Sequence, residues 1–346
     1  MQAEELFSHD RELTCHSEQG AIYTTVWLPD AADLTGETSH GKAVSARGET
    51  APTNGSGEAG SAHGETALTD VSAEAPTHVT AEASAHGTAE APADTAAASN
   101  DALADVAAAA LDGAKPSFHD TKPPLVIFCH ELGLDHRSAA PWARQLVAHG
   151  WAVASFDFCG GSIKPNKSDG SSRNMSVMTE VADLEAVSSE AATWDFVDTN
   201  RIVLMGASQG GIVAALTAHA HPEQVAALVL LYPAFSVSDG MRRLCPDPST
   251  VPDEFDLLGW MPVGKRYVTD MWHYEPFEHL DGYEGPTLII HGVDDPIVDV
   301  SYSRRAADVY HDCELYELSG EGHGFTNKAF KKASQIITGF LISRAG

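Results

Sequence analysis

The stretch Ile202-Val-Leu-Met-Gly-Ala-Ser-Gln-Gly-Gly211 contains a G-x-S-x-G motif, and the run after it, Ile212–Leu216, has helical character. An apolar strand that enters the motif and a helix that leaves it are the context of a nucleophile elbow, a tight turn that exposes a serine hydroxyl. The glycines leave room for the turn, and the helix N-terminus favours developing negative charge. The motif alone arises often by chance, but in this context it predicts Ser208 as a nucleophile.

A serine hydroxyl needs a base, and the base needs a carboxylate that fixes its tautomer. His323 stands in a glycine-rich loop after a strand-like run, so we predict that it is the base. The run His291-Gly-Val-Asp-Asp295 also follows a strand-like run and supplies the carboxylate. Its spacing favours Asp295 as the residue that orients the base, with Asp294 as the alternative.

Beyond residue 119, short apolar runs alternate with amphipathic stretches. We expect strands at 125–129, 152–158, 201–206, 228–232, 287–291 and 314–318, and one earlier in the chain at 21–28. We expect helices at 139–149, 176–195, 209–220, 303–311 and 328–342. The alternation indicates an α/β fold class in which helices cover both faces of a mostly parallel sheet. Together with the order serine, acid, histidine along the chain, it predicts the α/β-hydrolase fold.

Residues 235–284 interrupt this alternation. They contain no clean strand, many prolines and several aromatic residues. Open α/β sheets bind ligands at the carboxyl ends of their strands. We therefore expect the segment to form a small cap over that edge of the sheet.

The composition changes at residues 31–118, where Ala, Thr, Glu, Gly, Ser and His dominate. Acidic residues far outnumber basic ones there, and Phe, Tyr and Trp are absent before Phe118. Such a segment buries too little apolar surface to offset its ordering entropy. We therefore expect three parts, which are N-terminal strands of the hydrolase domain in 1–30, a low-complexity, disordered insertion in 31–118 and the catalytic domain in 119–346.

Acyl transfer needs two backbone N–H groups that point at the negatively charged oxygen of the intermediate. One is expected from Gln209, directly after the nucleophile, and the other from Leu132, in the loop after the strand at 125–129. That loop reads His130-Glu-Leu132, so Glu131 brings a carboxylate next to the predicted oxyanion hole. No spacing of His, Cys, Asp or Glu indicates a metal site, and this chemistry needs no cofactor.

Further short motifs occur together in the chain, namely Phe156-Asp-Phe158, Ser168-Asp-Gly170, Asn174-Met-Ser-Val177, Gly206-Ala-Ser-Gln-Gly-Gly211, Leu231-Tyr-Pro-Ala234, His291-Gly-Val-Asp-Asp295 and Gly322-His323. In combination they resemble the bacterial cinnamoyl and feruloyl esterases of the α/β-hydrolase superfamily. The resemblance implies hydrolysis of hydroxycinnamoyl esters, such as ferulate or caffeate esters, through an acyl-enzyme. It also implies that Tyr267 and Asp239 bind substrate from the cap. Glu131 and a longer loop at 160–167 depart from the family pattern.

The formal net charge of -28 disfavours nucleic-acid and anionic-membrane partners, because both attract basic residues. The N-terminal sequence MQAEELFSHDREL lacks the basic start and apolar run of a signal peptide, and no apolar run is long enough to span a membrane. Five cysteines without C-x-x-C spacing are typical of free thiols in a reducing compartment. We expect a cytoplasmic enzyme that acts on a small-molecule ester, and a homodimer remains open.

Alternatives remain at this point. A general small-acyl esterase or lipase-like enzyme, or a peptidase that resembles the prolyl oligopeptidase catalytic domain, would use the same three residues. Such a peptidase usually carries an N-terminal propeller, for which this chain has no room. A long-chain lipase would favour an apolar cap without phenol-binding polar groups. An inactive hydrolase fold that serves as a binding protein is disfavoured, because all three catalytic residue types are present.

Overall fold

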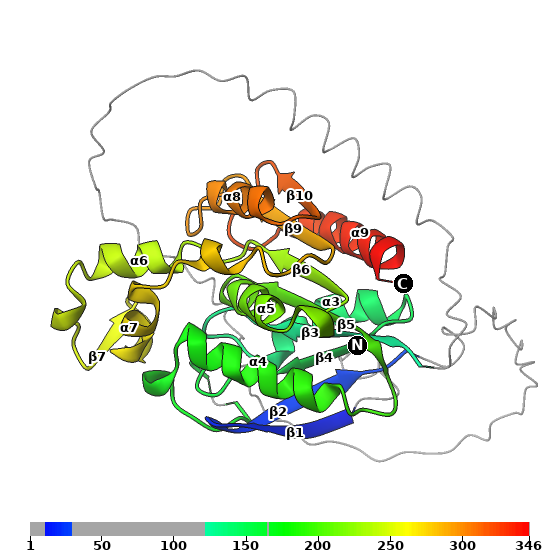
Figure 1. The fold of residues 1–346 in the computed structure, drawn as a ribbon, viewed down its shortest axis with the longest axis horizontal. Coiled ribbons are helices and arrows are strands. Elements are labelled where there is room, and N and C mark those ends of the chain that lie inside the picture. The colour runs from blue at the N-terminus through cyan, green and yellow to red at the C-terminus, as the bar shows by residue number, and fades with distance from the viewer. Residues whose placement is uncertain (1–10, 30–121, 165, 346) are drawn as a thin grey trace, which may run out of the picture. The chain divides into compact units, whose positions relative to one another are not determined.

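The computed structural model describes residues 11–29, 122–164 and 166–345. Its centre is an eight-stranded sheet in the order β1-β2-β4-β3-β5-β6-β9-β10 (Figure 1). The strands are β1 (Arg11–Ser17), β2 (Gly20–Trp27), β3 (Pro124–Cys129), β4 (Ala152–Phe156), β5 (Asp198–Ala207), β6 (Ala227–Leu231), β9 (Thr287–Gly292) and β10 (Cys313–Leu318). Neighbours from β4 to β10 are parallel, and β2 and β1 extend one edge in antiparallel pairing. The predicted α/β fold class is confirmed.

Helices cover both faces of the sheet. They are α3 (Ala140–Val147), α4 (Val177–Ala191), α5 (Gln209–Ala220), α8 (Ser301–Val309) and α9 (Asn327–Arg344). Buried residues of α4, α5 and α8 share one core cluster, and those of α3 and α9 share the other. In Figure 1, α4 and α5 lie across the side of the sheet that faces the viewer.

The strands divide their side chains between these two cores, because successive residues of a strand point to opposite faces. In β3, Leu125 and Ile127 join the core under α4 and α5, whereas Val126 and Phe128 join the core under α3 and α9. Every residue of β3 is buried. The central strands are therefore nearly continuous apolar runs, which is the pattern that made them visible in the sequence.

The 235–284 segment contains helices α6 (Val237–Leu244) and α7 (Arg266–Trp272) and a hairpin of β7 (Glu254–Leu257) with β8 (Met261–Gly264). The expectation that this segment has no strand is wrong. Both strands have only four residues, and β8 contains a proline, so neither gives a clear alternating pattern. The segment projects beyond the sheet in Figure 1, where α6, α7 and β7 are drawn in yellow-green and yellow.

Strand β2 ends at Trp27 and β3 begins at Pro124, and β4 lies between them in the sheet. The predicted 31–118 insertion thus falls in the connection between these two strands, and it lies outside the described residues. More than one strand was expected in 1–30, but no bounds were predicted for the edge strand β1, because five of its seven residues are exposed or half-buried and polar. No described helix combines the length and the apolar character needed to cross a membrane.

Candidate active site

Ser208 lies in the turn between β5 and α5, with φ 51° and ψ −116°, a region that residues other than glycine rarely adopt. The Ser208 N–H donates to the Leu231 carbonyl (2.9 Å), and the Gly211 N–H donates to the Ser208 carbonyl (3.0 Å). A Cβ at Gly206 would lie 2.1 Å from the Gly210 carbonyl oxygen, so the turn requires glycine there. This strained turn has the geometry of a nucleophile elbow and presents Ser208 at the N-terminus of α5.

Three side chains from distant parts of the chain meet at the carboxyl ends of β5, β9 and β10. His323 Nε2 lies 2.9 Å from Ser208 Oγ, and His323 Nδ1 lies 2.7 Å from Asp295 Oδ2. Because a carboxylate can only accept, the Nδ1 atom carries the imidazole proton and Nε2 is left to accept from the serine hydroxyl. The structure therefore brings together the three residues predicted as nucleophile, base and orienting acid.

The pairing of β9 with β10 places two loops against each other. The acid loop follows β9 and carries Asp294 and Asp295, and the histidine loop follows β10 and carries His323. The Asp294 N–H donates to the Glu321 carbonyl (2.9 Å), and a Cβ at Gly292 would lie 2.3 Å from that same oxygen. Asp294 itself is exposed, and its backbone rather than its carboxylate takes part in this contact. Of the two candidate acids, Asp295 is the one that reaches His323.

Asp295 has a hydrogen-bond donor on every side. Its Oδ1 accepts from the backbone N–H groups of Ile297 (2.8 Å) and Val298 (2.9 Å), and its Oδ2 lies 3.1 Å from His291 Nε2 as well as next to His323. Burial by itself would raise the pKa of Asp295. The hydrogen bonds from His291, His323 and the two N–H groups outweigh burial and hold the pKa well below its usual range. The carboxylate therefore stays ionised and fixed in direction.

The contacts of His291 show how this residue supports the acid. Its ring is fully buried, with Nδ1 2.6 Å from Ser303 Oγ and Nε2 2.9 Å from the Val298 carbonyl oxygen. The same Nε2 faces Asp295. His291 thus ties the acid loop to α8.

The two residues predicted to form the oxyanion hole, Gln209 and Leu132, both line the cavity in front of Ser208. Gln209 is the first residue of α5, so its N–H has no acceptor within the helix. Within the described part of the chain, neither the Gln209 N–H nor the Leu132 N–H donates to a protein acceptor. Both donors are available to a ligand oxygen, as an oxyanion hole requires.

Glu131, the departure from the family pattern, also lines the cavity. Its Oε1 accepts from the Tyr232 hydroxyl (3.0 Å), and the Tyr232 ring stands edge-on to the His323 ring with centroids 5.0 Å apart. Burial, reinforced by the Glu131 charge, raises the pKa of Tyr232, so its hydroxyl keeps its proton and donates it. Tyr232 thereby fixes one oxygen of the Glu131 carboxylate beside the loop that carries Leu132.

The oxyanion loop, which follows β3 and carries Glu131 and Leu132, is held in place by the buried side chain of His130. Its Nε2 accepts from the Phe158 N–H (3.3 Å), which leaves the proton on Nδ1 for the Glu131 carbonyl oxygen 2.8 Å away. Burial lowers the pKa of His130, so the ring is neutral and can act as donor and acceptor at once. His130 thus joins the loop after β3 to the residue after Asp157 through two hydrogen bonds.

The cavity in front of Ser208 has a volume of about 530 Å³. Its lining is mostly apolar and comes from the oxyanion loop, the histidine loop and the 235–284 segment, for example Leu132, Val237, Met241, Leu257, Trp260 and Val298. Several of the apolar residues at this cavity are exposed, including Leu258 (64%) and Ile297 (60%). An apolar cavity with few polar groups suits the acyl or alcohol part of an ester.

The two residues that the family resemblance implied for substrate binding differ in placement. Tyr267, on α7, lines the cavity and donates its hydroxyl to Gln209 Oε1 (2.5 Å). Asp239 is not among the lining residues. Its carboxylate accepts from Arg242 Nη2 (2.8 Å) and from the Tyr302 hydroxyl (2.6 Å), so it ties α6 to α8. We therefore do not retain Asp239 as a substrate-binding residue.

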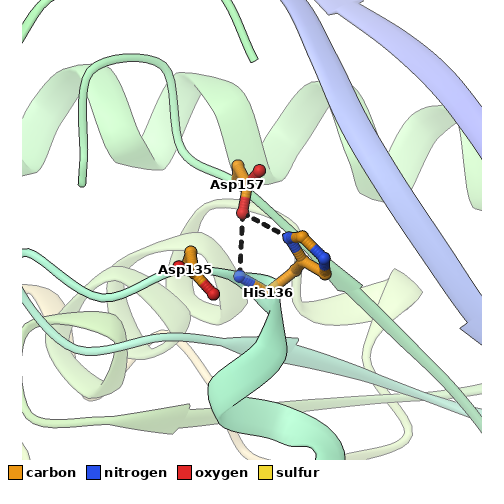
Figure 2. A group of neighbouring side chains, drawn as sticks. All are labelled: Asp135, His136 and Asp157. Atoms are coloured by element: carbon orange, nitrogen blue, oxygen red, sulfur yellow. Dashed lines mark hydrogen bonds and ion pairs between the residues drawn. The ribbon is translucent and has the colours of Figure 1, made fainter. Parts of the chain in front are cut away.

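A group of possible metal-ligand atoms lies outside this cavity, formed by Asp135, His136 and Asp157 (Figure 2). The Asp157 carboxylate accepts from the His136 N–H (2.8 Å) and the Lys167 N–H (3.1 Å), and its Oδ1 lies 2.7 Å from His136 Nδ1. Both oxygens of Asp135 are engaged by Arg137. Because protein donors already occupy these oxygens, the group links the loop after β3 to the end of β4.

Comparison with known proteins supports the α/β-hydrolase fold. A family model described as serine aminopeptidase, S33 matches residues 121–261. Est1E from Butyrivibrio proteoclasticus, solved with bound ferulic acid, is 26% identical with a TM-score of 0.60 over 67% of this chain and 93% of that chain. A monoacylglycerol lipase from Paleococcus ferrophilus, 19% identical with a TM-score of 0.51 over 64% of this chain and 96% of that chain, shares the fold.

Among curated proteins, monoacylglycerol lipase abhd6-A of Xenopus laevis is 24% identical over 40% of this chain. The match covers 54% of that protein, so the chain spans about half the length of its curated relative. The fold defines an α/β-hydrolase, and Ser208, His323 and Asp295 meet at its candidate active site. Within that class, the chain resembles the bacterial feruloyl esterases.

Proposed function

We propose that the protein is a serine carboxylic-ester hydrolase that works through an acyl-enzyme. The observation that carries this proposal is the hydrogen-bonded line Ser208–His323–Asp295 at the base of an apolar cavity with two free backbone donors. In the first step, His323 Nε2 takes the Ser208 proton while Oγ attacks the ester carbonyl carbon. Asp295 stabilises the imidazolium, and the Gln209 and Leu132 N–H groups hold the oxyanion.

The tetrahedral intermediate then collapses, and His323 gives its proton to the departing alkoxide, so that an alcohol leaves. Water enters, loses a proton to His323 Nε2 and attacks the acyl carbon. Collapse of the second intermediate breaks the bond to Ser208 Oγ, which recovers its proton from His323. The products are the carboxylic acid, the alcohol and the unchanged enzyme.

For the acyl group we propose a hydroxycinnamoyl unit such as feruloyl or caffeoyl. The ferulic acid bound to Est1E and the apolar cavity of about 530 Å³ support this choice. Tyr267 supplies a polar group among the apolar lining residues, at which a phenolic hydroxyl could bind. We also propose that residues 235–284 act as the cap that selects the substrate, since they supply a large part of the lining.

Hydrolysis of methyl ferulate tests the acyl group when it is compared with p-nitrophenyl acetate, p-nitrophenyl butyrate and a monoacylglycerol. We expect kcat/KM for methyl ferulate to exceed that for a monoacylglycerol, with both activities absent in Ser208→Ala. Turnover of the nitrophenyl esters alone would retain the serine esterase and discard the hydroxycinnamoyl group. Preference for the monoacylglycerol would favour a lipase-like enzyme, for which the exposed apolar residues at the cavity are the supporting observation.

We further propose that residues 31–118 form an insertion that is separate from the chemistry. All the site residues named above lie outside it, and it joins β2 to β3. A chain in which a short flexible linker replaces 31–118 should keep kcat/KM on p-nitrophenyl acetate within about threefold, because surface loops tolerate large changes in length. Loss of most of kcat/KM, in a protein that circular dichroism shows to be folded, would show that the insertion contributes to the site.

A cytoplasmic location and a homodimer are also proposals. The five cysteines support the former, because all of them are free thiols and three are buried. Sedimentation of the purified protein would decide its oligomeric state.

A further inference from the structure

A buried carboxyl group lies behind the oxyanion hole. Glu180, on α4, is 1% exposed, and its Oε2 accepts from Gln209 Nε2 (2.8 Å). The other end of the same amide, Gln209 Oε1, accepts from the Tyr267 hydroxyl (2.5 Å). Gln209 is therefore clamped between α4 and α7, and its backbone N–H is one of the two expected oxyanion donors.

Glu180 also lies next to the loop after β4, which supports the segment that carries the second donor, the Leu132 N–H. A Cβ built on Gly161 would lie 3.1 Å from Glu180 Oε1, so the loop after β4 passes directly over the carboxyl group. The carbonyl of Gly161 accepts from the Gly133 N–H (2.9 Å), and Gly133 follows Leu132, the second oxyanion residue. The Glu180 side chain is therefore adjacent both to Gln209 and to the loop that supports Leu132.

The beginning of α4 fixes the position of Glu180 along the chain. Ser176 and Thr179 form a capping box, in which Ser176 Oγ accepts from the Thr179 N–H and Thr179 Oγ1 accepts from the Ser176 N–H (2.8 Å). Glu180 follows directly, on the buried face of the helix. A fixed helix start and a fully enclosed side chain are what a group needs to hold its neighbours in one geometry.

We propose that Glu180 is a positioning residue for the oxyanion hole, acting through Gln209 and through the loop that carries Leu132. This inference rests on the esterase function proposed above. The chemistry that Glu180 supports is the transition-state charge on the carbonyl oxygen, so its loss should lower kcat and leave KM nearly unchanged.

The charge state of Glu180 gives the proposal a pH signature. Burial raises the pKa of Glu180 to about 8, a shift that the Gln209 hydrogen bond opposes and the Asp183 carboxylate reinforces. Among the described residues, the other titratable groups near it are the Cys129 thiol, the Tyr267 hydroxyl and the neutral His130 ring, none of which is a cation. Glu180 is therefore mostly protonated at pH 7. When it ionises above pH 8, its negative charge opposes the developing oxyanion.

Stopped-flow acylation by p-nitrophenyl acetate between pH 6 and 9.5 tests the proposal in the full chain, with the burst amplitude giving the concentration of working sites. Glu180→Met should lower the acylation rate per working site about tenfold at pH 7, with less than about twofold change in the half-saturating substrate concentration. The wild-type rate should decline above pH 8. Glu180→Gln should restore most of the rate lost in Glu180→Met and should show no such decline.

Glu185→Gln is the matched control, because Glu185 lies on the same helix and pairs with His221 (3.2 Å) at a partly exposed site. It should reproduce the wild-type rate and the wild-type pH profile. A Glu180→Gln profile that still declines above pH 8, or a Glu180→Met protein that acylates at the wild-type rate, would overturn the proposal. If Glu180→Met does not fold, the Glu180→Gln profile alone decides. A wild-type protein without an acylation burst would instead overturn the esterase function itself.

Discussion

Replacing Ser208 by alanine is expected to lower kcat on p-nitrophenyl acetate by about 10⁴-fold or more. The substitution removes the one oxygen that lies against His323 Nε2, so no acyl-enzyme can form. The oxyanion donors and the cavity remain, and they account for the small rate that should persist above the uncatalysed reaction. Initial rates at matched protein concentration, with folding checked by circular dichroism, provide the measurement.

Ser343→Ala serves as the control, since Ser343 is an exposed serine near the end of α9. It should match the wild type in kcat and KM. An alkyl fluorophosphonate should add one phosphonyl group to the wild type and to Ser343→Ala but none to Ser208→Ala, as read from the intact mass. If Ser208→Ala kept its turnover or its labelling, another residue would have to be the nucleophile.

The site residues that could be predicted from the sequence are those that belong to short local motifs. Gly206 and Gly210 flank Ser208 because the turn leaves no space for a side chain, and this requirement is visible as G-x-S-x-G. The acid and the histidine each stand directly after a strand, and the parallel order β5, β6, β9, β10 brings the ends of those strands to one edge. A fold with parallel strands therefore converts sequence order into spatial proximity.

Other features of the site depend on contacts that no local pattern records. Glu180 is one of several acidic residues in an amphipathic helix, and its burial follows from the way α4 packs against α5 and α7. Tyr232 was noted only as part of a motif, although its hydroxyl holds the Glu131 carboxylate. The implied role of Asp239 illustrates the opposite case, because Arg242 and Tyr302 engage a side chain whose position in the chain suggested a ligand. Such pairings require the three-dimensional structure.

Asp295→Asn is expected to lower kcat by roughly 10³- to 10⁴-fold with a smaller effect on KM, as is typical when the orienting acid of a triad becomes an amide. The hydrogen bonds around Asp295 explain the size of the effect. The Ile297 and Val298 N–H groups both donate to Oδ1 and will hold the single oxygen of an asparagine at that position. The NH₂ group must then point at His323 Nδ1, which can only accept from it.

That contact places the imidazole proton on Nε2, where it faces Ser208 Oγ and blocks proton transfer. Asp294→Asn is the matched control, because it makes the same chemical change at an exposed neighbouring carboxylate and should leave kcat within about threefold. The low-field proton resonance of a hydrogen-bonded Nδ1–H should be present in the wild type and in Asp294→Asn and absent in Asp295→Asn. A large loss of kcat in Asp294→Asn, with Asp295→Asn unaffected, would assign the orienting role to Asp294. Equal and large losses in both variants would indicate that the loop, rather than one carboxylate, sets the tautomer of His323.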